Sequence, residues 1–327
     1  MAKRSMTRFV ARTIKGAKPL GVMPGFIAPE LATLRANIPP GDTWIHEIKF
    51  DGYRLQAHSL RSEVTLYTRS GLNWTKRFPT VAAVVAKLPA ERIILDGEVI
   101  VEKDGRPNFS ELQADLANSR YDRMTYYAFD ILYLDGFDLR PSPLVERKRV
   151  LAGLLNEAAL AGPLFYSDHF ETEGKAIFDH CCRLGFEGVI SKRADAPYRS
   201  GRTEDWIKVK CVQRARFPIV GFIKETGSIA ALYLGKQDGK DLVYAGKVGT
   251  GFSRKVASEV RRRLDPLVSP KSKLTVAIRK PKATWVEPRL FAEVDYRDIT
   301  SDGLLRHSSF QGLFASAKST ESLTPRK

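Results

Sequence analysis

The chain reads His46-Glu47-Ile48-Lys49-Phe50-Asp51-Gly52-Tyr53-Arg54, which places a lysine directly before an acidic turn and an arginine. Alternation of apolar and polar side chains predicts strands over 46–50 and 55–58, on either side of a turn at Asp51-Gly52. Taken alone, this pattern also suits an exposed hairpin with charged residues. A lysine becomes a nucleophile only where cationic neighbours or desolvation lower its pKa, so the rest of the chain decides between the two interpretations.

Four further charged segments follow this one in order. They are Asp96-Gly97-Glu98 between two apolar strands, Phe129-Asp130 in a buried-strand run, EGVISK at 187–192 and WIKVK at 206–210. In the last segment, alternation places Trp206, Lys208 and Lys210 on one face of a strand. Two adjacent lysines repel each other unless an anion lies between them. A nucleotide phosphate would serve, so the pattern favours a phosphate-binding site.

The remaining hydrophobic pattern predicts an α+β chain with mixed structure first and mostly strands afterwards. Helical spacing occurs at 80–88, 147–161 and 173–184. After residue 211 there are four strand candidates and one helix, at 219–223, 230–234, 242–248, 291–296 and 253–264. Several short strands with one helix are typical of a small barrel, for example of the OB type, and we place the domain boundary near 211.

The charge is unevenly distributed along the 327 residues, whose net charge is +16. Residues 1–18 carry +6, residues 19–210 carry −1 and residues 211–327 carry +11. This asymmetry favours a polyanionic partner, a nucleic acid or an anionic membrane; a solubilising surface is the alternative.

Membrane insertion, secretion and disulfide stabilisation are not expected from this sequence. No apolar run approaches the roughly 18 residues of a membrane span. The basic N-terminus has no apolar segment of the kind found in signal peptides. The three cysteines, Cys181, Cys182 and Cys211, fit neither a disulfide framework nor a zinc ribbon. We therefore expect a soluble protein with reduced thiols.

In this order, the charged segments resemble the nucleotidyltransferase motifs of the ATP-dependent DNA ligases, in particular bacterial ligases of the end-joining type and the ligase module of multidomain end-joining enzymes. The likeness covers roughly residues 22–313, and YRSGR at 198–202 and DGLLRH at 302–307 strengthen it. It implies a nucleotidyltransferase (ATP-grasp-like) adenylation domain followed by a β-barrel OB-fold domain. The expected limits are 1–21 for a basic tail, 22–210 and 211–315 for the two domains and 316–327 for a C-terminal tail.

The resemblance also implies an activity and its partners. The enzyme would use ATP and Mg²⁺ or Mn²⁺ to seal 5′-phosphate/3′-hydroxyl breaks in duplex DNA through lysyl-AMP, in DNA repair or non-homologous end joining. Its partner would be duplex DNA with nicks or ends, and a Ku-like end-binding protein is a candidate. We expect a freestanding monomer without a membrane partner, in the bacterial cytoplasm and associated with the nucleoid.

Site residues carried over from the ligase motifs number nine. Lys49 would attack the α-phosphate, Glu47 would contact the adenine amino group and Phe129 would stack on adenine. Arg54 and Glu98 would hold the ribose and flanking groups, Arg69 would contact the 5′-phosphate, and Lys208 and Lys210 would clamp phosphates. Glu98 and Glu187 would bind the divalent metal.

The sequence departs from the ligase pattern near its C-terminus. The motif that contacts pyrophosphate is poorly matched, and we do not choose among Arg279-Lys280-Pro281-Lys282 and Trp285. Arg306-His307-Ser308-Ser309-Phe310 has serine where close relatives have proline. An RNA ligase or a capping guanylyltransferase shares the lysine chemistry, and a non-catalytic nucleic-acid-binding protein would explain the charge alone. A preference for nicks or for double-strand ends is left open.

Overall fold

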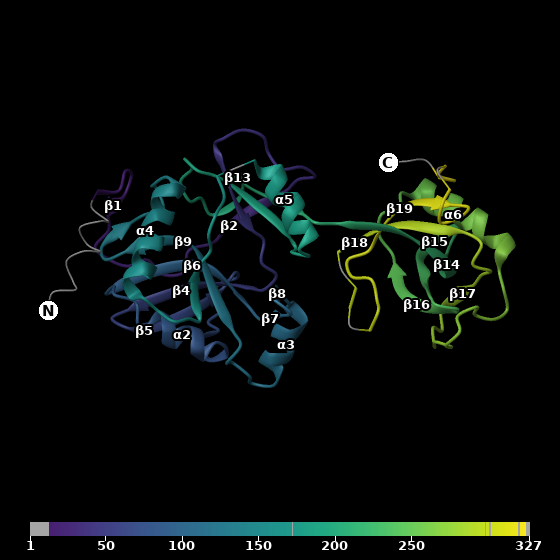
Figure 1. Ribbon diagram of the computed structural model, residues 1–327, viewed down its shortest axis with the longest axis horizontal. Helices are drawn as coiled ribbons and strands as arrows, with labels where there is room; N and C mark the ends of the chain where they lie inside the picture. The colour runs from purple at the N-terminus through teal and green to yellow at the C-terminus, as the bar shows by residue number, and fades with distance from the viewer. Residues whose placement is uncertain (1–12, 172, 298, 301, 320, 325–327) are drawn as a thin grey trace. The chain divides into compact units, whose positions relative to one another are not determined.

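Two compact units make up the computed structural model, the first ending at Cys211 and the second beginning at Val212 (Figure 1). The structure describes residues 13–171, 173–297, 299–300, 302–319 and 321–324. Most of the predicted basic tail, residues 1–12, lies outside this range, whereas Lys18–Pro19 (β1) pairs with a strand of the first unit. Among the described residues, no helix has the length and apolar character needed to cross a membrane.

The larger sheet of the first unit has seven strands in the order β1-β10-β9-β6-β4-β5, with β11 beside β9. Apart from β1, the strands are β4 (Tyr53–Leu60), β5 (Glu63–Thr68), β6 (Arg92–Ile100), β9 (Thr125–Leu134), β10 (Phe137–Asp138) and β11 (Leu164–Tyr166). All pair antiparallel except β11, which runs parallel to β9. One core combines side chains of this sheet, such as Leu55, with those of α2 (Pro79–Val85) and α4 (Leu144–Ala158).

A four-stranded sheet has the order β2-β13-β12-β3. Its strands are β2 (Glu30–Leu34), β3 (Trp44–Ile48), β12 (Gly188–Arg193) and β13 (Gly201–Lys210). A second hydrophobic cluster joins the two sheets: Ile94, Phe129 and Leu132 from the larger sheet pack with Trp206 of β13. The first unit also contains a 3-10 helix η2 (Thr75–Arg77), the short strands β7 (Glu102–Lys103) and β8 (Arg106–Pro107), and the helices α3 (Phe109–Ala117) and α5 (Gly174–Arg183).

The two strands expected on either side of Asp51-Gly52 are present, but the alternative interpretation as an exposed hairpin is wrong, because the strands belong to different sheets. β3 pairs with β12 in the four-stranded sheet, whereas β4 pairs with β5 and β6 in the larger one. The turn therefore carries the chain from one sheet to the other, and Lys49 lies at this crossing. Gly52 suits the position, because a side chain there would collide with the Val99 carbonyl oxygen.

The expectation that all three cysteines are reduced is also wrong. Cys182 and Cys211 form a disulfide, with Cα atoms 5.3 Å apart, and Cys181 is free and buried. Antiparallel pairing of β12 with β13 explains the contact, because it returns the chain to the end of α5 just after Lys210. The backbone N–H of Cys211 also donates to the Glu187 carbonyl oxygen (2.9 Å).

Six antiparallel strands form the sheet of the second unit, in the order β16-β15-β14-β18-β19 with β17 beside β14. They are β14 (Gln213–Glu225), β15 (Ser228–Asp238), β16 (Asp241–Val248), β17 (Ala283–Trp285), β18 (Phe291–Tyr296) and β19 (Ser309–Phe314). Among the described residues no ladder joins β16 to β19, so the expected barrel is not closed.

The helix of the second unit, α6 (Arg254–Leu264), is amphipathic. Ser253 caps it by accepting from the Val256 N–H, and Val256, Val260 and Leu264 are buried in the core with strand residues such as Leu232. A 3-10 helix, η3 (Asp265–Leu267), follows directly.

Candidate active site

Strand register gathers some of the predicted residues on one face of the four-stranded sheet. Glu47 on β3 and Lys208 on β13 both lie opposite Ile190 of β12, and Lys192 lies opposite Trp206. Because side chains alternate along a strand, Glu47 shares its face with Lys49, and Trp206 shares its face with Lys208 and Lys210. The alternation that predicted a common face for Trp206 and the two lysines is thus realised in the structure.

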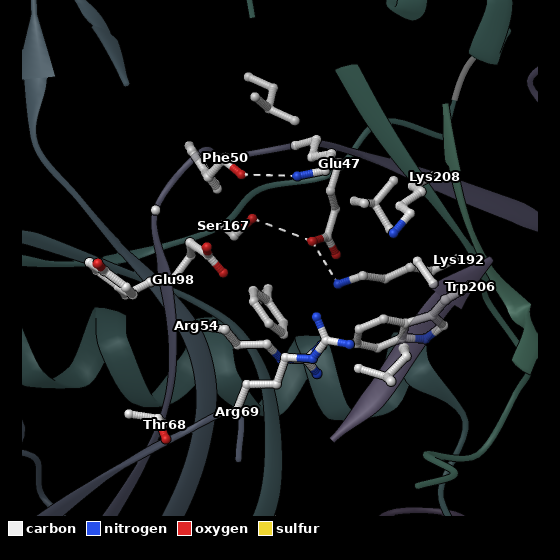
Figure 2. Close-up of a pocket in the computed structure, with 18 of the residues that line it drawn as sticks. Glu47, Phe50, Arg54, Thr68, Arg69, Glu98, Ser167, Lys192, Trp206 and Lys208 are labelled. Carbon is white, nitrogen blue, oxygen red and sulfur yellow. Dashed lines mark hydrogen bonds and ion pairs between the residues drawn. The ribbon is translucent and has the colours of Figure 1, made fainter. Parts of the chain in front are cut away.

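A cavity of about 600 Å³ lies against this face, within the size range of small-molecule sites (Figure 2). Seven of the nine predicted residues line it: Glu47, Lys49, Arg54, Arg69, Glu98, Phe129 and Lys208. The other two, Glu187 and Lys210, do not line the cavity but lie beside it, paired with each other, and Glu187 also pairs with Lys49. The cavity draws on both sheets, since Arg54, Glu98 and Phe129 come from β4, β6 and β9.

The Lys49 amine is held by the sheet and by one carboxylate. Its backbone N–H donates to the Gly188 carbonyl oxygen (2.9 Å), and its Nζ donates to Glu187 Oε2 (2.5 Å) and to the Phe50 carbonyl oxygen (3.4 Å). Lys210 Nζ lies 3.1 Å from the other oxygen of Glu187. Burial opposes ionisation of Glu187, but the two lysines hold its pKa below the ordinary value. Glu187 therefore orients both amines beside the cavity.

Cations dominate this end of the cavity. Burial lowers the pKa of Lys208, and four neighbouring positive charges lower it further. These are Lys49, Arg202, Lys210 and Arg69. Such a cluster is stabilised by a polyanion, and phosphoryl transfer requires this kind of compensation for developing negative charge.

Arg54 is fixed by a partner that sequence reasoning missed. Asp96 accepts two hydrogen bonds from its guanidinium group, at 2.9 and 2.6 Å, and the Glu30 carbonyl oxygen accepts a third at 2.6 Å. The guanidinium carbon lies 5.2 Å from the ring centre of Phe129 and 5.5 Å from that of Trp206. Asp96 belongs to the charged segment Asp96-Gly97-Glu98 that the sequence pointed to, but only Glu98 was predicted to have a role.

The aromatic end of the cavity combines Phe129 and Trp206, whose rings meet edge to face with centres 5.9 Å apart. Lys192 Nζ lies 4.4 and 4.2 Å from these two ring centres. It also donates to Glu47 Oε2 (2.7 Å), an interaction that Figure 2 marks with a dashed line. A second lysine, Lys148 of α4, donates to Glu47 Oε1 (2.8 Å). Lys192 and Trp206 belong to the charged segments that the sequence pointed to. Nothing in the sequence of the amphipathic helix α4 distinguishes Lys148.

Two acidic side chains, Glu98 and Glu187, are the candidates for a metal site. Glu98 is partly buried opposite Arg54 in the β4–β6 ladder. Burial raises its pKa to about 7, against the opposing charges of Lys49 and Arg54. Within the described ranges no group of three or more His, Cys, Asp or Glu side chains could enclose a metal. Two hard carboxylates nevertheless suit Mg²⁺, which takes most of its remaining ligands from water and substrate phosphates.

Comparison with known proteins places this geometry in a family. The model of the ATP-dependent DNA ligase domain matches residues 30–210, and that of the ATP-dependent DNA ligase C-terminal region matches residues 225–314. The chain belongs to the ATP-dependent DNA ligases. The resemblance drawn from the sequence motifs is therefore confirmed.

Two relatives of this ligase chain are bacterial end-joining proteins. The multifunctional non-homologous end joining protein LigD of Pseudomonas aeruginosa is 41% identical over 301 residues, which cover 89% of this chain and 36% of the relative. Its counterpart in Mycolicibacterium smegmatis is 33% identical over 279 residues, covering 83% of this chain and 36% of that protein. The chain thus spans 36% of the length of these curated relatives.

Solved structures agree with this assignment. The crystal structure of the ligase domain of Mycobacterium tuberculosis LigD is 32% identical and gives a TM-score of 0.53. The match covers 91% of this ligase chain and 98% of that domain. A mycobacterial DNA ligase D complexed with ATP and MES also has 32% identity and a TM-score of 0.53, covering 92% of this chain and 98% of that one.

Proposed function

We propose that this chain seals 5′-phosphate/3′-hydroxyl breaks in duplex DNA through a lysyl-AMP intermediate, in end joining or repair. The observation that carries the proposal is the position of Lys49: its amine lines a nucleotide-sized cavity, next to a cluster of cations. Relatives named as end-joining proteins support the biological setting.

Three transfers make up the reaction: the AMP group moves to Lys49 and then to the DNA 5′-phosphate, and the DNA phosphoryl group is then transferred to the 3′-hydroxyl. The Lys49 nitrogen attacks the ATP α-phosphate, so that an N–P bond forms, the bond to pyrophosphate breaks, pyrophosphate leaves and the nitrogen gives up its proton. A 5′-phosphate oxygen of DNA then displaces the lysine, which gives AMP-capped DNA. Finally the 3′-hydroxyl attacks the DNA phosphate, loses its proton and releases AMP. Lys208, Lys210 and Arg69 neutralise the charge that develops on phosphate oxygens.

The nucleotide is held by the residues around the cavity. Glu47 accepts from the adenine amino group and Phe129 stacks on the base, while Arg54 and Glu98 hold the ribose and flanking groups. Glu98 and Glu187 would bind Mg²⁺ or Mn²⁺ together with substrate oxygens. The metal, when bound, supplies charge stabilisation and orientation of the phosphates.

The proposal extends to the second unit and to the partners of the chain. An excess of eleven positive charges over 211–327 and an antiparallel sheet with one α-helix support an OB-fold domain that binds duplex DNA. We propose domain limits of 22–210 and 211–315, tails at 1–21 and 316–327, and monomeric action in the cytoplasm at nucleoid DNA. A Ku-like protein that binds DNA ends is the proposed recruiting partner.

Nucleotide labelling tests the proposal. The protein is incubated with Mg²⁺ and α-labelled ATP or GTP, and covalent label is detected after denaturing electrophoresis. Label from ATP alone supports the ligase, label from GTP indicates capping chemistry, and no label with either nucleotide contradicts the proposal. Sealing of nicked, cohesive and blunt DNA then measures the preferred break.

A further inference from the structure

The Glu47 carboxylate is enclosed by two buried ammonium groups from different parts of the fold. Lys148 Nζ of α4 donates to one of its oxygens (2.8 Å), and Lys192 Nζ of β12 donates to the other (2.7 Å). The Ser167 hydroxyl adds a longer contact of 3.4 Å. The side chains of Glu47, Lys148 and Lys192 are 3%, 0% and 2% exposed. Buried lysines are rare and need partners, so this arrangement calls for an explanation.

Lys148 does not line the cavity itself but contacts two residues that do, Glu47 and Ser167. Its Nζ also donates to the Ser167 carbonyl oxygen (2.8 Å) and lies 4.6 Å from the ring centre of Tyr166. Glu47, Ser167 and Lys192 line the cavity, but Lys148 does not. Lys148 therefore contacts the lining of the cavity through the Glu47 carboxylate and the Ser167 carbonyl oxygen, and of these two groups only the carboxylate is charged.

The Glu47 carboxylate, paired with two lysines, suits a purine base that carries an amino group. An ionised carboxylate offers about four acceptor positions, of which the two lysines and Ser167 use three, so it can still accept from an amino group. Adenine has such an amino group beside ring nitrogens that accept hydrogen bonds, whereas guanine has a carbonyl oxygen at the same ring position. That oxygen would meet the negative charge of Glu47 unfavourably.

We propose that Lys148 is a positioning residue that orients the Glu47 carboxylate, and thereby sets the preference of the cavity for 6-aminopurine nucleotides. The inference rests on the proposed function, in which Glu47 contacts the base of ATP. Lys192 assists from the cavity side, where its ammonium faces Phe129 and Trp206.

The test compares ATP with purine riboside triphosphate, which lacks only the 6-amino group. Lysyl-AMP formation, or formation of its analogue, is measured over a range of nucleotide concentrations for the full chain and for Lys148→Met. We expect the ratio of ATP use to analogue use to fall about tenfold in the variant, because loss of one hydrogen bond to a charged group lowers affinity by about this factor. The loss should appear in KM, with kcat at saturating ATP changed less than about twofold.

Arg147→Lys is the matched control. Arg147 precedes Lys148 in α4, is equally buried and pairs with the Asp130 carboxylate at 2.8 Å, but it does not contact Glu47. Its substitution should lower stability and leave the ratio of ATP to analogue use unchanged. Lys148→Arg, which keeps a cation, should recover part of the preference.

Two further results decide the proposal. Adding Lys148→Met to Glu47→Gln should cause no further loss of preference if Lys148 acts through Glu47. A wild-type preference in Lys148→Met, or additive losses in the double variant, would overturn the inference. If Lys148→Met does not fold, Lys148→Gln is judged by the same ratio. Failure of the wild-type chain to form lysyl-AMP would instead contradict the proposed function.

Discussion

Arg54 and Asp96 form a bidentate ion pair between the neighbouring strands β4 and β6, with N–O distances of 2.9 and 2.6 Å. The Asp96 side chain is 1% exposed and that of Arg54 is 15% exposed. The Tyr198 hydroxyl also donates to Asp96 (2.8 Å). The position of Arg54 at the cavity therefore depends on a residue that does not line it.

Asp96→Asn should destabilise the first unit by about 3 kcal/mol, because it leaves the Arg54 charge buried without its counter-ion. Urea unfolding measures this loss. The control is Asp138→Asn, since Asp138 makes an equally bidentate but more exposed pair with Arg140 and should lose less than about 1 kcal/mol. Equal losses in the two variants would contradict the importance of this pair.

Phe129→Ala should weaken ATP use by about 1–3 kcal/mol through lost stacking, measured as the ATP dependence of lysyl-AMP formation. Phe129→Tyr keeps the ring and should be mild. Phe129 is also 9% exposed in the cluster with Trp206, so stability must be measured in parallel. If both variants show wild-type ATP dependence, Phe129 has only a packing role.

Glu98→Gln should stabilise the nucleotide-free protein at pH 8 but not near pH 4.5. Burial raises the native pKa of Glu98 to about 7, whereas an unfolded glutamate titrates near 4.3. Between these two pH values the native state retains a proton that the unfolded state has released. The free energy of unfolding of the wild type therefore falls as the pH rises through this range. We expect a gain of about 1–3 kcal/mol at pH 8. A gain that is the same at both pH values would refute the raised pKa.

Reduction of the Cys182–Cys211 disulfide should lower the free energy of unfolding by about 3–4 kcal/mol, given its sequence separation of 29. Urea unfolding with and without a thiol reductant measures the difference. Cys182→Ser should lower the free energy of unfolding by a similar amount, whereas Cys181→Ser, which keeps the disulfide, should not show this loss. Thiol titration of the denatured, unreduced protein should find one free cysteine, and a count of three would show that the bond is absent.

Local patterns predicted much of the candidate site because many of its residues lie on strands, along which side chains alternate between the two faces. The alternation in 206–210 placed Trp206, Lys208 and Lys210 on one face, and the order of charged segments located Lys49 and Glu187. What the sequence could not show is which strands pair. The sequence therefore predicted the strands on either side of Asp51-Gly52 but not that they belong to different sheets, and the Cys182–Cys211 contact likewise depends on long-range pairing.

Lys148 could not be found from the sequence for a different reason. A lysine in an amphipathic helix is usually solvated, and only the packing of α4 near β3 brings it to Glu47. Strand β19 (Ser309–Phe314) was also missed, because its pairing with β18 is a long-range contact.

The central claim, that Lys49 is the nucleophile, is tested most directly with Lys49→Ala. This variant is compared with the wild type and with Glu187→Ala in two assays: formation of lysyl-AMP from ATP, and sealing without ATP of a nick that already carries AMP on its 5′-phosphate. Lys49→Ala should form no lysyl-AMP yet still seal the pre-adenylylated nick, because the last step needs no lysine nucleophile. Glu187→Ala should impair both reactions. Lysyl-AMP formation by Lys49→Ala would contradict the account.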